Sequence, residues 1–331
     1  MRLSTSTARV RAVDERLLED WEGWLKVGLK RFGASGYGES ARALTMADVR
    51  QEIGSSDVLF SHAIEEDQGR GLVVVLHARW EEGVIERPVA KVSLLVADTH
   101  AIAVGLAREV IQACRAGDVV LVSATPGHSP TFIHCALAEA GFHVASQSLT
   151  VKADLEAIAP AVARIPIRGV FRTATSSDAG AIVDIAGRAF VNARLMADPF
   201  FPLEWGSQLM RAWARNLVNG GADEILVAEA SGEVLGFATM TWEADRRRRL
   251  PVLMAVEPRY DGAGIGAMLT RQMLDWYRTR GMKVFLGTTE KSNMAMNALY
   301  ARLGFSVLDS NLVYHASPAL SPLRERLMNR A

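Results

Sequence analysis

Two stretches of this chain, 163 positions apart, follow the same pattern of apolar and polar residues. VVLVSATPGHSPTFIHCALAEAGFHV (119–144) and KVFLGTTEKSNMAMNALYARLGFSV (283–307) align across the helical part without a gap, and both close on A-x-x-G-F. In each stretch a short apolar run precedes apolar residues at helical spacing, which predicts a strand followed by a helix. The chain of 331 residues is also longer than one such unit needs. We therefore expect two copies of one domain that mixes helices and strands; chance agreement between two segments of this kind is the alternative.

A glycine-rich turn is found in the second half and not at the matching place in the first. Gly262, Gly264 and Gly266 alternate along DGAGIGA. Glycines leave the backbone N–H groups of such a turn bare, so these groups can converge on an anion at the positive end of the following helix. Apolar spacing predicts that helix from Ile265 onward, and Gly281 predicts its end. The turn therefore predicts a phosphate site, whereas an ordinary turn is the alternative.

The last helix of the second copy carries Asn293 and Tyr300. Seven residues are about two helical turns, so both side chains are expected on one face, where they can line one channel. A tyrosine that only packs in the core, and an asparagine that only starts the helix, are the alternatives; Ser292 is a further candidate for the N-cap. Pro130 and Leu137 occupy the matching positions of the first copy. The first copy is therefore expected to have lost this site.

These residues resemble the acyl-coenzyme A site of the GCN5-related N-acetyltransferase (GNAT) superfamily. The resemblance implies an α/β fold, layered in the α+β manner, with two acetyltransferase-like domains, each a mixed and mostly antiparallel sheet flanked by helices. The N-terminal domain (1–165) would be degenerate and the C-terminal domain (166–331) catalytic. Acetyl-coenzyme A, or another acyl-coenzyme A, would be the co-substrate, and Tyr300 would protonate its departing thiolate. The residues that match the family's cofactor site are Met254, Ala255, Val256, Asp261, Gly262, Ala263, Gly264, Ile265, Gly266, Ala267 and Asn293.

Two positions depart from the family pattern. The family usually has Arg or Gln at Asp261 and a small residue at Met296. An acidic side chain beside a pyrophosphate is unfavourable unless it points away, and Arg259 is near enough in sequence to compensate. The sequence does not determine the length of the acyl chain, although Met254, Met296 and Met240 near the channel could accommodate a group larger than acetyl.

The segment 189–213 is where members of the superfamily build the acceptor pocket. Its aromatic residues, which include Phe201 and Trp205, predict either a lid over a ring-shaped substrate or plain packing. Its F-x-x-A-R-L run ahead of an Asp-Pro pair is similar to bacterial acetyltransferases that act on nucleotide-linked amino sugars. The candidate substrate-binding residues are Arg194, Asp198 and Phe200. We therefore expect a small-molecule amine as acceptor, with a nucleotide-linked amino sugar as the first choice.

A primary amine is largely protonated at neutral pH, so the reaction needs a base. Glu243 and Glu290 stand at the ends of predicted strands, where solvated glutamates are also common. The run Arg246–Arg249 would contact a phosphate of the cofactor or the substrate, or form a solvated loop tip. Two other functions are alternatives: acetylation of a protein or peptide amine, and a non-catalytic sensor of acyl-coenzyme A. The presence of both Asn293 and Tyr300 argues against the sensor, which needs no acid for a thiolate.

Composition excludes several other classes. Lys plus Arg and Asp plus Glu are equal at 37 each, so no affinity for nucleic acid or acidic membranes is expected. Cys114 and Cys135 fall on predicted helices, which favours a reducing compartment over a disulfide framework. The N-terminal residues have no apolar core typical of a signal peptide, so a cytoplasmic location is expected. The seven histidines lack the spacing of metal ligands, and no metal is expected.

Overall fold

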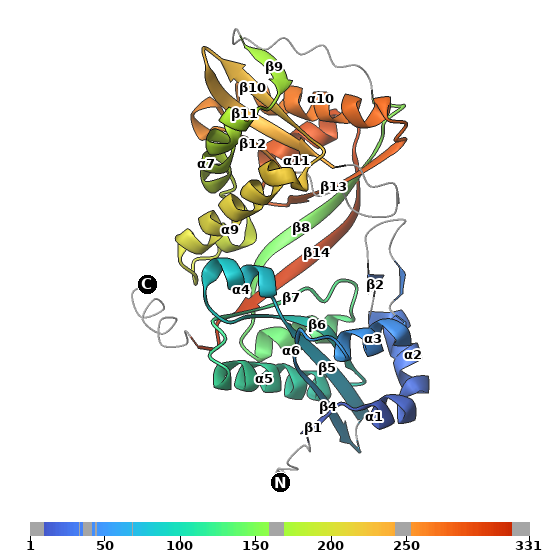
Figure 1. Ribbon diagram of the computed structural model, residues 1–331. Coiled ribbons are helices and arrows are strands. Elements are labelled where there is room, and N and C mark those ends of the chain that lie inside the picture. Colours follow the sequence, from blue (N-terminus) through green and yellow to red (C-terminus); the bar gives the residue numbers. More distant parts are fainter. Residues whose placement is uncertain are drawn as a thin grey trace. The chain divides into compact units, whose positions relative to one another are not determined.

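The structure of the chain is a computed structural model that describes residues 10–32, 34–35, 42–43, 45–67, 69–158, 169–241 and 253–319. The chain divides into two compact units (Figure 1): Met1–Gln147 with Asn311–Ala331, and Ser148–Ser310. Within the described ranges, no helix combines the length and the apolar character needed to cross a membrane.

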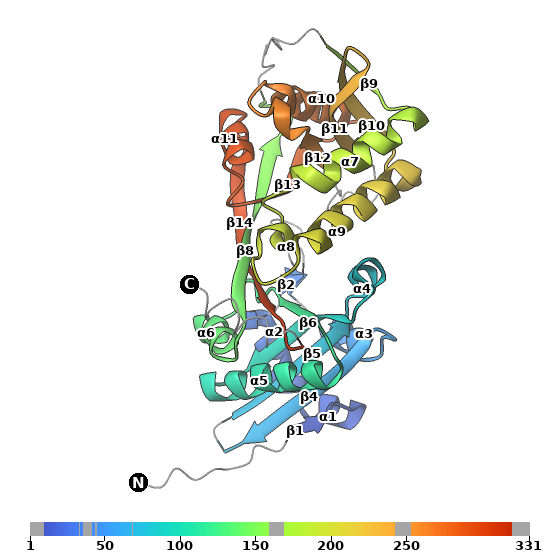
Figure 2. The same cartoon turned by 90° about the vertical axis from the view of Figure 1, so that its left-hand side faces the viewer.

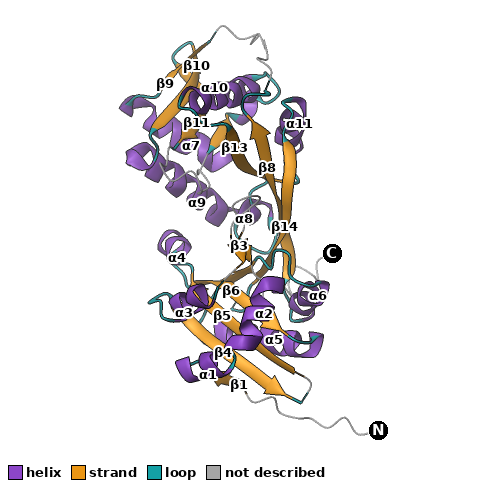
Figure 3. Ribbon diagram, turned by 90° about the vertical axis from the view of Figure 1, so that its right-hand side faces the viewer, coloured by secondary structure: helices purple, strands orange, loops and turns teal. Residues whose placement is uncertain are grey.

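The first half of the chain forms a sheet with helices on both faces (Figure 3). Its elements are β1 (Val10–Ala12), α1 (Glu15–Asp20), α2 (Glu22–Phe32), β2 (Ala34–Ser35), β3 (Arg42–Ala43), α3 (Met46–Ile53), β4 (Val58–Glu66), β5 (Gly69–His77), α4 (Arg79–Ile85), β6 (Val89–Ala97), α5 (His100–Ala116), β7 (Leu121–Ala124), α6 (Thr131–Glu139) and β8 (His143–Asp154). Neighbouring strands follow the order β1, β4, β5, β6, β7. The β6–β7 pair is parallel, and the other ladders of this order are antiparallel.

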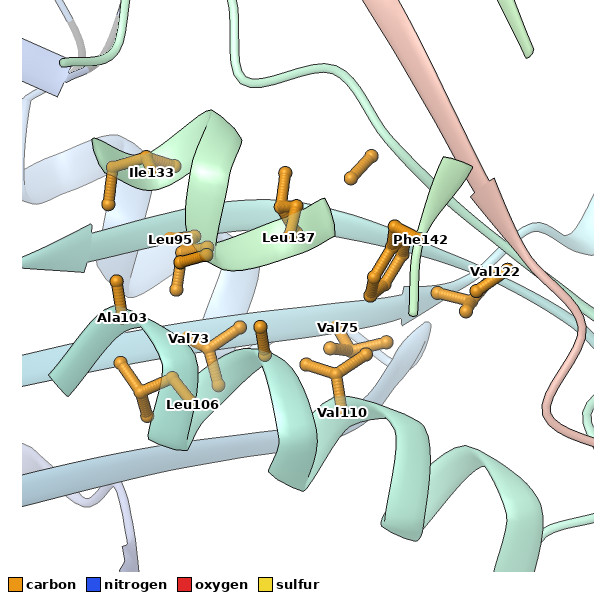
Figure 4. Close-up of a cluster of buried hydrophobic side chains, with 14 of the residues drawn as sticks. Val73, Val75, Leu95, Ala103, Leu106, Val110, Val122, Ile133, Leu137 and Phe142 are labelled. Atoms are coloured by element: carbon orange, nitrogen blue, oxygen red, sulfur yellow. The ribbon is translucent and has the colours of Figure 1, made fainter. Parts of the chain in front are cut away.

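Alternation along β5 separates two apolar cores. Val73 and Val75 face the core formed with α5 and α6, where they lie beside Leu106 and Val110 (Figure 4). The side chains of Leu72, Val74 and Leu76 face the opposite core, formed with α1, α2 and α3. Successive side chains of a strand point to opposite faces, so a strand that is apolar throughout indicates a sheet covered on both sides.

The second half repeats this plan. Its elements are β9 (Val170–Thr173), α7 (Ala179–Ala189), α8 (Arg194–Ala197), α9 (Leu203–Asn216), β10 (Glu224–Ala230), β11 (Glu233–Met240), β12 (Met254–Val256), α10 (Ile265–Thr279), β13 (Val284–Glu290), α11 (Met294–Arg302) and β14 (Ser306–Ala316). The antiparallel sheet β12–β11–β10–β9 has α10 on one face and α7 and α9 on the other (Figure 2). β12 is the last strand of this sheet, and β13 belongs to a different ladder.

Each unit takes its last strand from the other half of the chain. β14 follows α11, yet its residues Tyr314–Ala316 pair antiparallel with β7 of the first unit. β8 follows α6, yet its residues Ser148–Asp154 pair antiparallel with β13 of the second unit. The two halves have therefore exchanged their final strands. The expected boundary between residues 165 and 166 lies outside the described residues and stays a prediction.

The bounds of the elements confirm the internal repeat. Adding 163 to the bounds of α6 gives the bounds of α11, and the same offset joins the first residues of β7 and β13 and those of β8 and β14. The N-cap residues also correspond, because Pro130 precedes α6 and Asn293 precedes α11. The candidate N-cap Ser292 was wrong by one residue.

Replacing Ala316 with aspartate is expected to destabilise the first unit by about 3 kcal/mol or more, because the carboxylate would enter an apolar core. Ala316 is the last residue of β14 and is buried in the core of β5, α5 and α6. Hydrogen exchange should then accelerate in β5, β7 and α5. Val307→Asp is the matched control, since Val307 lies on the same strand but is 59% exposed; it should cost less than about 1 kcal/mol. Unchanged exchange in the first unit of the Ala316 variant would contradict the exchanged-strand topology.

Candidate active site

The start of α10 offers bare backbone N–H groups. Gly264 is the N-cap residue with φ of 82°, and no side chain caps the helix. The first helical hydrogen bond runs from the N–H of Met268 to the carbonyl of Gly264, so the three preceding N–H groups, at residues 265–267, have no partner within the helix. Gly262 also has a positive φ, 79°, and a Cβ on either glycine would meet open space. The start of α10 therefore has the open, uncapped geometry that an anion cradle needs, and anion binding there stays a prediction.

β12 turns half of its backbone groups away from the sheet. The N–H of Thr239 donates to the carbonyl of Leu253, and the N–H of Glu257 donates to the carbonyl of Leu235. Backbone bonds of a strand alternate between its two edges, so Met254 and Val256 direct their N–H and C=O groups to the opposite edge. That edge has no ladder among the described residues. The cradle adjoins it, because a Cβ on Gly266 would lie 3.6 Å from Cγ2 of Val256.

α11 carries the predicted asparagine and tyrosine. Oδ1 of Asn293 accepts the N–H of Met296 at 3.1 Å, so this residue does cap the helix. The ring of Tyr300 stacks on Phe305 with 4.5 Å between centroids, and the residue is 8% exposed. Burial raises the pKa of the Tyr300 hydroxyl to about 12. The phenol therefore keeps its proton at neutral pH, as a proton donor must.

In the first unit, the positions that match the start of α10 and Tyr300 carry residues with other roles. Oγ1 of Thr99 accepts the N–H of Ile102 and so caps α5, where the second unit has a bare helix start. The preceding Asp98 accepts hydrogen bonds from the indole N–H of Trp24 at 2.6 Å and from the backbone N–H of Arg70 at 3.0 Å. Leu137, at the position of Tyr300, is buried in the apolar core. These contacts explain why the first unit has no anion cradle at this place.

The structure changes the interpretation of two side chains near the cradle. Arg259 forms an ion pair with Glu233 and lies over the ring of Tyr260, 5.0 Å from its centroid, so it is engaged away from the exposed Asp261. Met240 is fully buried in the core beside α10, so its assignment to the channel was wrong. Met254 and Met296 are partly buried.

The candidate acceptor residues lie on and after the short helix α8. Arg194 begins α8 and is partly buried. Asp198 is 3% exposed, and its Oδ1 accepts the N–H of Phe200 at 3.0 Å, which closes the turn before α9. Phe201 is buried and lies 5.9 Å from Trp205 between ring centroids, which favours packing over a mobile lid for that pair. Substrate contacts by Arg194, Asp198 and Phe200 stay predictions.

Of the two candidate bases, the structure describes Glu290. Glu290 is the last residue of β13, partly buried and directly before the loop that leads to Asn293. Glu243 and the run Arg246–Arg249 lie outside the described residues.

Two polar contacts near the site were missed by sequence reasoning. Nδ2 of Asn297 donates to the carbonyls of Glu290 and Lys291, at 3.1 and 3.0 Å. Arg188 of α7 forms a 2.7 Å ion pair with Glu257, the residue that follows β12. Asparagine is a poor helix former, so its presence inside a predicted helix could have indicated that the side chain of Asn297 makes a specific contact. The pairing of Arg188 has no comparable local signal, since its partner is 69 residues away.

Comparisons with known proteins agree with this geometry. A model of the acetyltransferase (GNAT) family matches residues 191–305. The spore coat polysaccharide biosynthesis protein SpsD of Bacillus subtilis is 29% identical over 141 residues, which cover 43% of this chain and 48% of that protein. Streptothricin acetyltransferase of Streptomyces lavendulae is 32% identical over 157 residues, which cover 44% of this chain and 76% of that protein. The chain thus spans about half the length of SpsD and three quarters of the streptothricin enzyme.

Two solved structures share the fold over almost the whole chain. A GCN5-related N-acetyltransferase from Sphaerobacter thermophilus has a TM-score of 0.57, is 14% identical, and is matched over 95% of this chain and 96% of its own. A tandem GNAT protein from the clavulanic acid biosynthesis pathway has a TM-score of 0.50 at 14% identity, over 94% of this chain and 98% of its own. The chain therefore has the fold of two acetyltransferase-like domains, as expected from the sequence. Together with the family match and the likeness to the streptothricin enzyme, this shared fold shows that the chain belongs to the GNAT family of acetyltransferases.

Proposed function

We propose that this chain is an acyl-coenzyme A-dependent N-acetyltransferase that moves an acetyl group to the primary amine of a small molecule. The observation that carries the proposal is the uncapped, glycine-lined start of α10 beside the edge of β12 that pairs with no strand in the described part of the chain. A bare helix start attracts a pyrophosphate, and a free strand edge can hydrogen-bond the amide groups of a pantetheine arm. The two features together fit both polar parts of coenzyme A.

The co-substrate supplies an acetyl group activated as a thioester. Backbone N–H groups at Met254 and Val256 stabilise the negative charge that develops on the carbonyl oxygen. The hydroxyl of Tyr300 gives its proton to the departing sulfur, and Asn293 steadies the pantetheine arm. Glu290 takes the proton from the attacking amine, directly or through water; Glu243 is the second candidate for this step.

The proposed acceptor is a small-molecule amine, with nucleotide-linked amino sugars as the first class to test. Support comes from relatives whose names refer to the acetylation of small molecules, namely streptothricin, L-methionine sulfoximine and mycothiol, and from SpsD, which is named for polysaccharide biosynthesis. Arg194, Asp198 and Phe200 are the proposed acceptor residues. Acetylation of a peptide amine is the second candidate function. Its only support is the proposed cofactor site, which would serve either acceptor.

Calorimetric titration of the full chain with acetyl-coenzyme A tests the cofactor site. Binding in the micromolar range is expected, and release of the free thiol should then appear with amine acceptors, amino-sugar nucleotides first. Absence of binding would overturn the proposal. Tight binding without thiol release from any sugar, antibiotic or peptide amine would replace it with a sensor of acyl-coenzyme A.

A further inference from the structure

Asn297 lies in the second turn of α11, one turn after Asn293. Both of its described side-chain hydrogen bonds are made by Nδ2, to the carbonyls of Glu290 and Lys291. An amide nitrogen has two hydrogens, so one side chain satisfies two consecutive carbonyls. Asparagine lowers the intrinsic stability of a helix interior relative to leucine or alanine. Its presence here is therefore not explained by helix formation.

The bonds of Asn297 complete a closed set around the loop between β13 and α11. The N–H of Asn293 donates to the carbonyl of Glu290, and the N–H of Asn297 donates to the carbonyl of Asn293. Oδ1 of Asn293 in turn accepts the N–H of Met296. Nδ2 of Asn297 adds two side-chain bonds that join the helix back to the end of β13 and the residue after it. The bond to Lys291 holds a carbonyl that lies beyond the end of β13 against α11.

We propose that Asn297 is a positioning residue of the transferase: it clamps residues 290 and 291 so that Asn293 meets the pantetheine arm at a fixed distance. The proposal rests on the function proposed above. Asn297 itself touches no substrate, and it acts through the loop. The rest of the cofactor site, at the start of α10, belongs to a different segment and does not depend on this clamp.

The clamp predicts a loss that is confined to the pantetheine arm. Asn297→Leu keeps the size of the side chain and improves helix propensity but removes both donors. Two lost hydrogen bonds are expected to weaken acetyl-coenzyme A about tenfold or more. Binding of 3′-phospho-ADP, which carries the pyrophosphate but no arm, should stay within about twofold. The melting temperature should not fall, so a general loss of structure would be recognised.

Three further variants complete the test. Asn297→Gln keeps two N–H donors and should recover most of the affinity, whereas Asn297→Asp, which sets a carboxylate against two carbonyls, should be the weakest binder. Ala298→Leu is the matched control, because Ala298 is exposed on the same turn and makes no side-chain hydrogen bond. It should bind both ligands as the wild type does.

The outcomes separate this inference from the proposed function. If the wild type binds acetyl-coenzyme A and Asn297→Leu binds it equally well, the positioning role is wrong and the function stands. If Asn297→Leu weakens both ligands to the same extent, the residue is merely structural and the inference is again overturned. If the wild type binds neither ligand, the proposed function fails, and the inference falls with it.

Discussion

Gly264→Glu is expected to abolish measurable binding of acetyl-coenzyme A, a loss of at least about a hundredfold. A glutamate at the N-cap would point a carboxylate into the open space above the bare N–H groups of residues 265–267, where the pyrophosphate would sit. Two like charges at that distance repel strongly, and the side chain also fills the cradle. Calorimetric titration of the purified variant measures the effect.

Backbone strain alone must be excluded for this variant. Gly264 has φ of 82°, and a residue with a Cβ there costs about 1 to 2 kcal/mol. Gly281 lies just beyond the other end of α10 with φ of 81° and open space around its Cβ position. Gly281→Glu therefore carries the same strain and the same charge, and it should bind acetyl-coenzyme A normally. Equal loss in both variants would show that stability, and not the cradle, controls binding.

Tyr300→Phe is expected to lower kcat by about a hundredfold to ten-thousandfold, the usual contribution of a general acid. The stacking on Phe305 depends on the ring, which phenylalanine keeps, so folding and the binding of acetyl-coenzyme A should change little. Steady-state kinetics at saturating acetyl-coenzyme A measures the loss. A decrease in kcat of less than about threefold would remove Tyr300 from the mechanism.

Tyr277→Phe is the matched control. Burial also raises the pKa of Tyr277 to about 12, but its hydroxyl hydrogen-bonds the backbone of Thr241 and is assigned no chemical role. Its loss should lower stability by about 1 kcal/mol without the kinetic signature.

Free tyrosine has a pKa near 10, so the unfolded chain loses the protons of Tyr277 and Tyr300 first, and the free energy of unfolding should fall as the pH rises from about 10 to 12. The wild-type kcat profile should accordingly show no alkaline loss from Tyr300 below pH 10.

Local features of the structure were the predictable ones. The glycine turn was recognisable because a positive φ at Gly262 and Gly264 requires residues without a Cβ, and the repeat was recognisable because apolar spacing follows the period of each element. The strand exchange was not predictable. Local pattern identifies β14 as a strand but contains no information on its partner, and β7 and β13 offer similar edges. The ion pair of Arg259 with Glu233 escaped prediction for the same reason, since it joins two residues that the pairing of β11 with β12 brings together.

The exchanged strands also have a consequence for the order of synthesis. The first unit needs residues 314–316 to pair with β7. The N-terminal part of this unit ends at Gln147, so the ribosome adds 167 more residues to reach residue 314. At a translation rate of about 5 to 20 residues per second, the edge of β7 waits roughly 10 to 30 s on the ribosome. An unpaired edge strand is a template for other strands, and β14 of a neighbouring chain is the same segment as the strand that is missing. Assembly on crowded polysomes should therefore produce some interlocked pairs of chains, which dilution after synthesis cannot separate.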